Sequence, residues 1–321
     1  MREIRIEKNE SGQRLDKFLQ KYLREASKSF LYKMLRKKNI KLNNTRAEGK
    51  EILAPGDIVS IYFSDETIAK FRGAQTETCY PRRKLDILYE DDEVALINKP
   101  AGMLSQKAKN DDATLVEYFL GYLQESGKWK QKGAFTPGVC NRLDRNTSGL
   151  VIAGKSLPGL QKMSELLRER AIDKYYTTIV EGVIREPLII RGYLSKDAKT
   201  NKVMVYDEAG PERTFIETGY NPLRDNGEYT LLQVKLITGK THQIRSHLGS
   251  IGHPLMADVK YGGKKVAGER SFFLHAARLC FPLLEEPFHG LSEREIQAPL
   301  PARFENKIEQ LFGKRGMEGL L

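Results

Sequence analysis

Residues 141 to 148 form a polar segment that holds one carboxylate between two guanidinium groups. Asp144 lies between Arg142 and Arg145, and an apolar run, Leu150–Ala153, follows at once. A carboxylate in a loop beside a strand can act as a nucleophile or as a general base, and such loops carry function disproportionately. The alternative is a turn residue that pairs locally with one of the two arginines. The residues alone leave both interpretations open.

Two further side chains could join Asp144 in a site. Tyr176 lies in a β-rich run, 173–182, where a tyrosine is commonly a core aromatic. Arg245 lies in a predicted helix, 242–249, capped by Thr241. On that helix Arg245 lies about 100° from Ile244, at the edge of the buried face. A guanidinium there could enter a cleft and pair with a carboxylate.

Histidines cluster near this helix, but their spacing does not favour a metal site. His242 and His247 point about 140° apart on a helix, and no H-E-x-x-H or C-x-x-C motif accompanies them. The three cysteines are far apart, as expected of a reduced cytosolic protein. The chain has neither a P-loop nor a Rossmann fingerprint. We therefore expect neither a metal nor a cofactor.

Charge points toward a polyanionic partner. The 321 residues carry a net charge of +11, and the sequence pI is about 9.3. Residues 1–65 hold 15 Lys and Arg against nine Asp and Glu, which is more than half of the excess. A merely basic surface is the alternative to nucleic-acid binding. The sequence shows neither the apolar block of a secretory signal nor a membrane-length apolar run, so we expect a cytoplasmic protein.

The N-terminal residues predict a small α/β unit. Leu15–Leu23 has the apolar spacing of an amphipathic helix, and a second helix begins at Ser27 or Ser29 and ends where Asn39 takes the left-handed conformation. Short strands and a turn are expected at Ile40–Leu42, Pro55–Asp57 and Ile58–Phe63, followed by a linker from Ser64 to Arg83. Basic residues crowd the second helix and form either a solvated face or a phosphate-binding ridge.

The remaining chain alternates strand and helix patterns. Strands are predicted at 85–89, 94–98, 150–153, 173–182 and 229–237, and helices at 114–123, from Ser156 onward and at 242–249. Residues 126–134, which include Trp129, the only tryptophan, are expected to be a mobile basic loop.

The N-terminal segment resembles an S4 RNA-binding domain. The resemblance rests on Arg14–Leu19, Ser27–Ser29, Ile40–Asn43 and Pro55–Val59, with Asn39 in place of the usual glycine. It implies that RNA is held by residues of the two helices. These are Arg14, Lys17, Ser29, Lys33, Arg36, Lys37 and Lys38.

The larger segment, from about Leu85 to Phe304, resembles the RluA-type pseudouridine synthases. The motifs are Leu88–Asp91 with Asn98–Gly102, Arg142–Leu150, Lys174–Gly182, Thr238–His247 with Gly252–Gly262, Phe273–Ala276 and Ala298–Pro301. Two positions depart from the family pattern. Asn141 stands where the family usually has His, and Ala257 stands where Gly commonly precedes Asp258.

The resemblance implies an α+β fold. A catalytic domain at 84–312, built on a large mixed, mostly antiparallel β-sheet, would follow the S4-like domain at 1–65 and a linker at 66–83. A tail at 313–321 would end the chain.

The resemblance also implies residue roles. Asp144 would be the essential carboxylate, Tyr176 would stack on the target base and Arg245 would pair with Asp144. Arg142 would help to fill the place of the extruded nucleotide. Substrate contacts are expected from five residues, namely Arg142, Lys99, Arg145, Thr147 and His242.

The expected activity is isomerisation of uridine to pseudouridine in RNA by base flipping, without cofactor or metal, by a monomer. The combination with an S4 domain favours large-subunit (23S) ribosomal RNA as substrate. A tRNA substrate, and a non-catalytic RNA-binding or ribosome-assembly factor on the same scaffold, are the alternatives.

Overall fold

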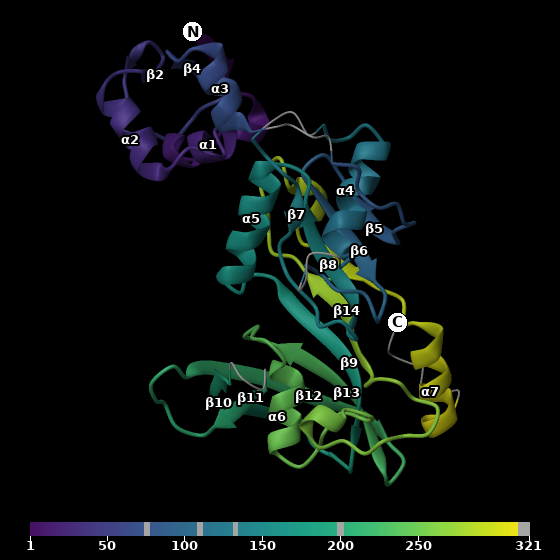
Figure 1. The fold of residues 1–321 in the computed structure, drawn as a ribbon. Helices are drawn as coiled ribbons and strands as arrows, with labels where there is room; N and C mark the ends of the chain where they lie inside the picture. The colour runs from purple at the N-terminus through teal and green to yellow at the C-terminus, as the bar shows by residue number, and fades with distance from the viewer. Residues whose placement is uncertain (74–77, 108–111, 131–133, 198–201, 314–321) are drawn as a thin grey trace.

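The computed structural model describes residues 1–73, 78–107, 112–130, 134–197 and 202–313. Figure 1 shows a small N-terminal unit beside a larger body built on one long sheet. Of the predicted tail, residues 314–321 lie outside the described residues. Within the described part of the chain, no helix has the length and apolar character needed to cross a membrane.

The N-terminal unit is a four-stranded sheet covered by helices, with strand order β1-β4-β2-β3. Its elements are β1 (Arg2–Arg5), a 3₁₀ turn (Lys8–Glu10), α1 (Leu15–Tyr22), α2 (Lys28–Arg36), β2 (Ile40–Leu42), β3 (Thr45–Arg46), β4 (Ile58–Ile61) and α3 (Asp65–Arg72). Leu15, Phe18 and Leu19 of α1 are buried in its core, as their helical spacing predicts.

The ends of α2 differ in part from the prediction. Ser27, rather than Ser29, caps the helix by accepting a hydrogen bond from the Phe30 amide. The left-handed residue after the helix is Lys38, with φ of 63°, and Asn39 does not take that conformation. The left-handed turn therefore comes one residue earlier than expected.

The segment predicted as a linker begins with a helix. Ser64 caps α3 by accepting a hydrogen bond from the Thr67 amide, and Ile68 is buried in the core of the N-terminal unit. Phe30 and Phe71 pack with ring centroids 4.6 Å apart. The linker prediction is therefore wrong for residues 65–72, which belong to the small unit.

The larger body is an eleven-stranded sheet whose main path runs β11-β10-β12-β13-β9-β14-β8-β6-β5. Only β14 and β8 pair in parallel among the strand pairs described, so the sheet is mixed and mostly antiparallel, as expected. Its strands are β5 (Ile87–Glu90), β6 (Val94–Lys99), β7 (Gly138–Val139), β8 (Ser148–Gly154), β9 (Asp173–Glu181), β10 (Leu188–Lys196), β11 (Val203–Tyr206), β12 (Thr214–Asp225), β13 (Tyr229–Leu236), β14 (Leu274–Cys280) and β15 (Glu295–Gln297).

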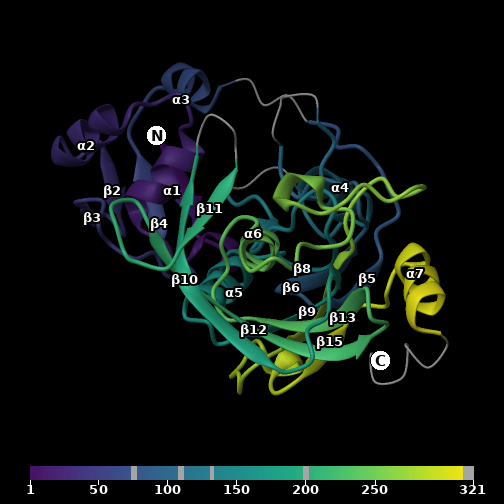
Figure 2. The same cartoon turned by 90° about the horizontal axis from the view of Figure 1, so that it is seen from below.

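Helices bury both faces of this sheet. They are α4 (Leu115–Glu125), α5 (Leu157–Arg168), α6 (Gln243–Ser250) and α7 (Ala302–Phe312), with 3₁₀ turns at Val259–Tyr261 and His289–Leu291. Alternate residues of β8 separate into two cores. Val151 packs with residues of α4 and α6, whereas Ile152 packs with Met163 of α5 on the opposite face. Figure 2 shows α6 lying over the sheet between β11 and β8.

The loop after α4 also differs from the prediction. Trp129 is 9% exposed and belongs to the core that contains α4, and its indole Nε1 donates to the Phe135 carbonyl at 3.3 Å. The expectation of a mobile basic loop is therefore wrong at Trp129. Residues 131–133 of that loop lie outside the described residues.

Candidate active site

The strand register brings the Asp144 loop next to Tyr176. Gly149 of β8 pairs with Ala276 of β14, and Ala276 pairs in turn with Tyr176 of β9. Asp144 lies four residues before the start of β8, so its loop lies at the end of β8 where Gly149, Ala276 and Tyr176 are paired across the three strands. A Cβ at Gly149 would lie 2.2 Å from the Ala276 carbonyl oxygen, and the residue has φ of 107°. Close approach of the strands thus requires glycine here.

The Asp144 loop is held from several directions. Ser105 Oγ donates to the Leu143 carbonyl at 2.9 Å and accepts from the Leu143 amide at 3.1 Å. The Asp144 carbonyl accepts from the Thr147 amide at 3.1 Å, which closes a turn. The backbone around the carboxylate is thereby fixed, and its side chain stays 24% exposed.

Arg245 joins Asp144 to a second carboxylate. Its Nη1 lies 3.0 Å from Asp144 Oδ2, while Nε and Nη2 bind the two oxygens of Asp258 at 2.7 and 2.8 Å. The guanidinium also stacks 4.1 Å from the centroid of Phe272. Burial opposes the charged form, but the two carboxylates outweigh it and raise the pKa of Arg245. One guanidinium shared by two carboxylates thus holds Asp144 through a single contact and leaves its side chain partly exposed.

His242 faces the same oxygen of Asp144 as Arg245 does. It precedes α6 in the left-handed conformation, with φ of 54°, and Nε2 is 3.7 Å from Asp144 Oδ2. The predicted Thr241 cap is therefore wrong, because the helix begins one residue later and His242 is its N-cap. Burial lowers the pKa of His242, more than the Asp144 charge raises it, so the ring is neutral.

A hydrogen bond with Tyr261 orients the His242 ring. The Val203 amide donates to the Tyr261 hydroxyl oxygen at 3.2 Å, and that hydroxyl lies 2.8 Å from His242 Nδ1. Nδ1 is thereby held by Tyr261, and Nε2 is the ring nitrogen that faces Asp144.

Tyr176 is almost fully buried beside the carboxylate. It is 7% exposed and packs with Val234 and Ala276 in the core below α6. Burial and the nearby charge of Asp144 both raise the pKa of the Tyr176 phenol. Tyr176, Asp144 and Arg245 thus come together from β9, the loop before β8 and α6, as predicted.

The other predicted substrate contacts divide into two groups. Arg142 and Arg145 are exposed, although Arg145 lies 3.9 Å from Asp112. Lys99 and Thr147 are 0% and 2% exposed, so a direct substrate contact does not fit their burial.

The Lys99 ammonium binds the carbonyls of Pro100, Met103 and Arg145 at 3.0, 2.8 and 3.2 Å. Burial lowers its pKa to about 7, against the opposing Asp144 charge. Lys99 therefore ties the Asp144 loop to the end of β6 instead of projecting into a site.

The unusual Asn141 has a structural role. Its Oδ1 accepts from the Ile152 amide at 2.8 Å, and its Nδ2 lies 3.5 Å from the Leu150 carbonyl. The side chain thus binds β8 much as a neighbouring strand would.

The sequence analysis predicted no role for Asp258 or Tyr261. Asp258 is 2% exposed and holds Arg245 with both oxygens. Gly252 and Pro254 end α6 and turn the chain back along the helix, which was the signal that could have placed Asp258 beside Arg245. Among the described residues, no group of three or more His, Cys, Asp or Glu could hold a metal ion.

Comparison with known proteins agrees with this site. Residues 93–250 match the family model described as RNA pseudouridylate synthase. The chain is 30% identical to ribosomal large subunit pseudouridine synthase C of Vibrio vulnificus, over 97% of each chain. It is 31% identical to the enzyme of the same name from Haemophilus ducreyi, over 97% of this chain and 95% of that one.

A solved structure shares the fold. Human RNA pseudouridylate synthase domain containing 4 aligns with a TM-score of 0.58 and 21% identity, covering 70% of this chain and 92% of the human one. The full-length sequence likeness, added to the convergence of Asp144, Tyr176 and Arg245, identifies the chain as a member of the RluA-type family of RNA pseudouridine synthases.

Proposed function

We propose that this enzyme converts uridine to pseudouridine in large-subunit ribosomal RNA, with Asp144 as its reacting carboxylate. The observation that carries the residue assignment is the bridge from Asp144 through Arg245 to Asp258. The relatives named ribosomal large subunit pseudouridine synthase C support the choice of RNA.

The reaction breaks the N1–C1′ bond, turns the uracil and rejoins it to the sugar through C5. The target nucleotide must leave its stack to reach a recessed carboxylate. Asp144, bound by Arg245, can attack the sugar as a nucleophile or remove a proton as a base. Tyr176 offers the freed uracil an aromatic face while it turns.

The N-terminal unit would hold the RNA outside the site as an S4-like domain that extends through α3. Lys33, Arg36, Lys37 and Lys38 are exposed at the end of α2, a position that suits phosphate contacts. Ser29 and Lys17 are exposed as well, whereas Arg14 binds Asp16 at 3.0 Å. We further expect a cytoplasmic monomer.

In vitro modification of defined RNAs tests this proposal. Purified protein is incubated with transcripts of 23S and 16S ribosomal RNA and tRNA, and pseudouridines are mapped chemically. We expect product in 23S RNA only. Asp144→Asn should form none while binding RNA within a few-fold of the parent protein.

Three results would contradict the proposal. Modification confined to tRNA would overturn the choice of substrate. Tight RNA binding by the parent protein without any product would favour the assembly-factor alternative. An active Asp144→Asn enzyme would refute the role of the carboxylate.

A further inference from the structure

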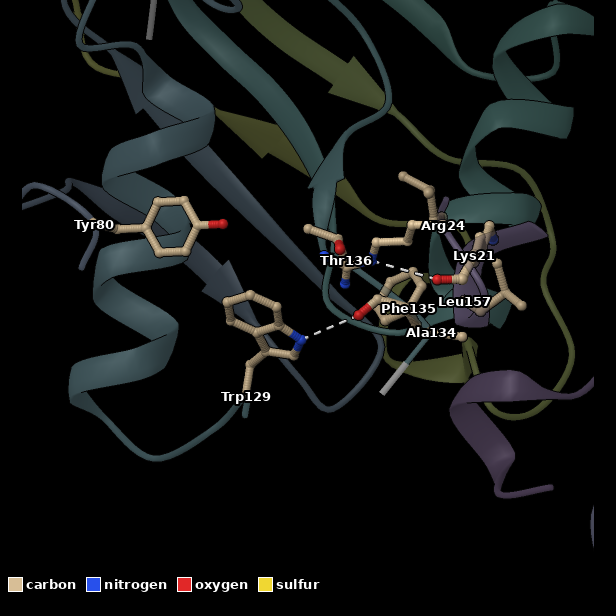
Figure 3. A pocket seen from close by; sticks show the side chains of 9 residues that line it. Lys21, Arg24, Tyr80, Trp129, Ala134, Phe135, Thr136 and Leu157 are labelled. Atoms are coloured by element: carbon tan, nitrogen blue, oxygen red, sulfur yellow. Dashed lines mark hydrogen bonds between the residues drawn. The ribbon is translucent and has the colours of Figure 1, made fainter. Parts of the chain in front are cut away.

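A cavity lies between the N-terminal unit and the catalytic domain, and no residue of the candidate active site lines it. Its volume is about 470 Å³, within the usual range for small-molecule sites. Lys21 and Arg24 line it from the N-terminal unit, and Tyr80, Trp129 and the first turns of α5 line it from the other side (Figure 3).

Contacts outside the cavity lining, together with one from the lining residue Ala134, join the two units. Lys8 and Glu93 pair at 2.5 Å, and the Ala134 amide donates to Glu10 Oε1 at 3.3 Å. Gln161 of α5 also donates to the Gly12 carbonyl at 3.3 Å. These contacts hold the two units that line the cavity against each other.

One side of the cavity is aromatic. The rings of Tyr80 and Trp129 lie with centroids 6.0 Å apart and planes inclined by 52°. The bond from Trp129 Nε1 to the Phe135 carbonyl fixes the indole, as Figure 3 shows. Tyr80 is only partly buried, so it can offer a face to a planar group. Fixed aromatic rings of this kind stack with unpaired bases.

The opposite side is cationic. Lys21 and Arg24 are exposed, and within the described part of the chain neither pairs with a carboxylate. Lys21 Nζ donates to Gln13 Oε1 at 3.0 Å, while burial and the nearby charge of Lys17 lower its pKa. An anion placed here would relieve that unfavourable charge.

We infer that this cavity binds one unpaired nucleotide of the RNA substrate, its base on Tyr80 and Trp129 and its phosphate on Lys21 and Arg24. The inference rests on the proposed binding of RNA by both units. Lys17, already expected to contact RNA, lies one turn before Lys21 on α1, so the backbone could run from one to the other. An acidic peptide would use the two cations but would not need the rings.

The sole tryptophan makes the cavity observable. A single-stranded RNA oligonucleotide that contains no uridine is titrated into the full-length protein, and Trp129 emission is followed together with the anisotropy of end-labelled RNA. We expect binding to quench the emission. Lys21→Gln with Arg24→Gln should weaken binding about tenfold and lower the slope of log K against log salt by about 0.7 for each phosphate that the variant no longer neutralises.

The matched control variant removes the same number of positive charges from another part of the N-terminal unit. Arg2→Gln with Arg5→Gln lies on β1, outside the cavity, and should leave quenching unchanged. Tyr80→Phe should bind normally, whereas Tyr80→Leu should weaken binding about fivefold or more, because only a ring stacks.

Binding without quenching, or equal losses in the two double variants, would overturn the cavity site. So would equal affinity of Tyr80→Phe and Tyr80→Leu. Quenching by a polyglutamate peptide as strong as by RNA would overturn the choice of ligand. In these cases normal 23S modification by the parent protein would leave the proposed function standing, whereas its absence would reject that function separately.

Discussion

Arg245 binds two carboxylates that differ in burial, and this difference separates the one that positions the guanidinium from the one that is open to substrate. Asp258 is 2% exposed and has both oxygens on the guanidinium, whereas Asp144 is 24% exposed and has one. Removing one member of a buried ion pair costs about 3–5 kcal/mol, and the cost falls with exposure. Asp258 therefore positions Arg245, and Asp144 is left free for chemistry.

The unequal burial predicts unequal stabilities. Asp258→Asn should lower the free energy of unfolding by about 3–5 kcal/mol and also abolish turnover, because Arg245 loses its anchor. Asp144→Asn should lower it by about 1 kcal/mol, although turnover is lost as well. Denaturant unfolding and a pseudouridine assay measure both. Equal destabilisation by the two variants would contradict a positioning role for Asp258.

Tyr176 can be a core aromatic, a stacking platform or both, and substitution separates these roles. Since no described residue bonds its hydroxyl, Tyr176→Phe should keep both stability and most activity. Tyr176→Leu keeps an apolar side chain but loses the ring, so activity should fall about tenfold or more. Tyr220→Leu, in the same core, is the control. Activity lost equally in both Leu variants would point to packing alone.

At the scale of elements, β8, β14 and β9 set the geometry of the site, and one glycine permits their approach. Gly149→Ala would place a Cβ 2.2 Å from the Ala276 carbonyl and also strain a positive φ. We expect a loss of about 3 kcal/mol or more in unfolding free energy. Gly102→Ala, with φ of 87° and open space around its Cβ, should lose only about 1–2 kcal/mol. Similar losses would remove the steric argument.

The sequence predicted the elements whose periodicity is strong, whereas β10, β11, β12, β14 and α7 had no prediction. Apolar spacing located α1, a β-rich run located β9, and start and stop residues located α6. The resemblance to the RluA-type family supplied Tyr176 and Arg245 as partners of Asp144. Residues whose roles depend on distant partners were not predictable in this way. Lysine is usually exposed, so nothing in the local sequence indicates that Lys99 is buried on three carbonyls. The α3 helix did have a start signal, Ser64 followed by Asp65 and Glu66, but only one of its residues, Ile68, is buried.

At the scale of the whole molecule, two buried histidines make stability depend on pH. His247 and His275 are 0% exposed, and burial lowers the pKa of each to about 4. His275 Nε2 faces the Ala298 carbonyl, while Nδ1 faces Ser148 Oγ. Between about pH 4 and pH 6.5 these histidines are protonated in the unfolded chain, where their pKa values are ordinary, but stay neutral in the folded chain.

The contribution of each buried histidine to the free energy of unfolding is therefore fully present above about pH 6.5. It is lost as the pH drops to about 4, by about 3 kcal/mol for each histidine. His275→Gln should reduce the slope of unfolding free energy against pH in this window by up to about 1.4 kcal/mol per pH unit. Exposed His289, changed to Gln, supplies the control and should leave the slope unchanged. Urea unfolding followed by circular dichroism at pH 7, 6, 5 and 4.5 measures both slopes. If His275→Gln matches the parent slope, His275 takes up its proton within the folded protein, and the sheet around Ser148 must open more easily than its burial implies.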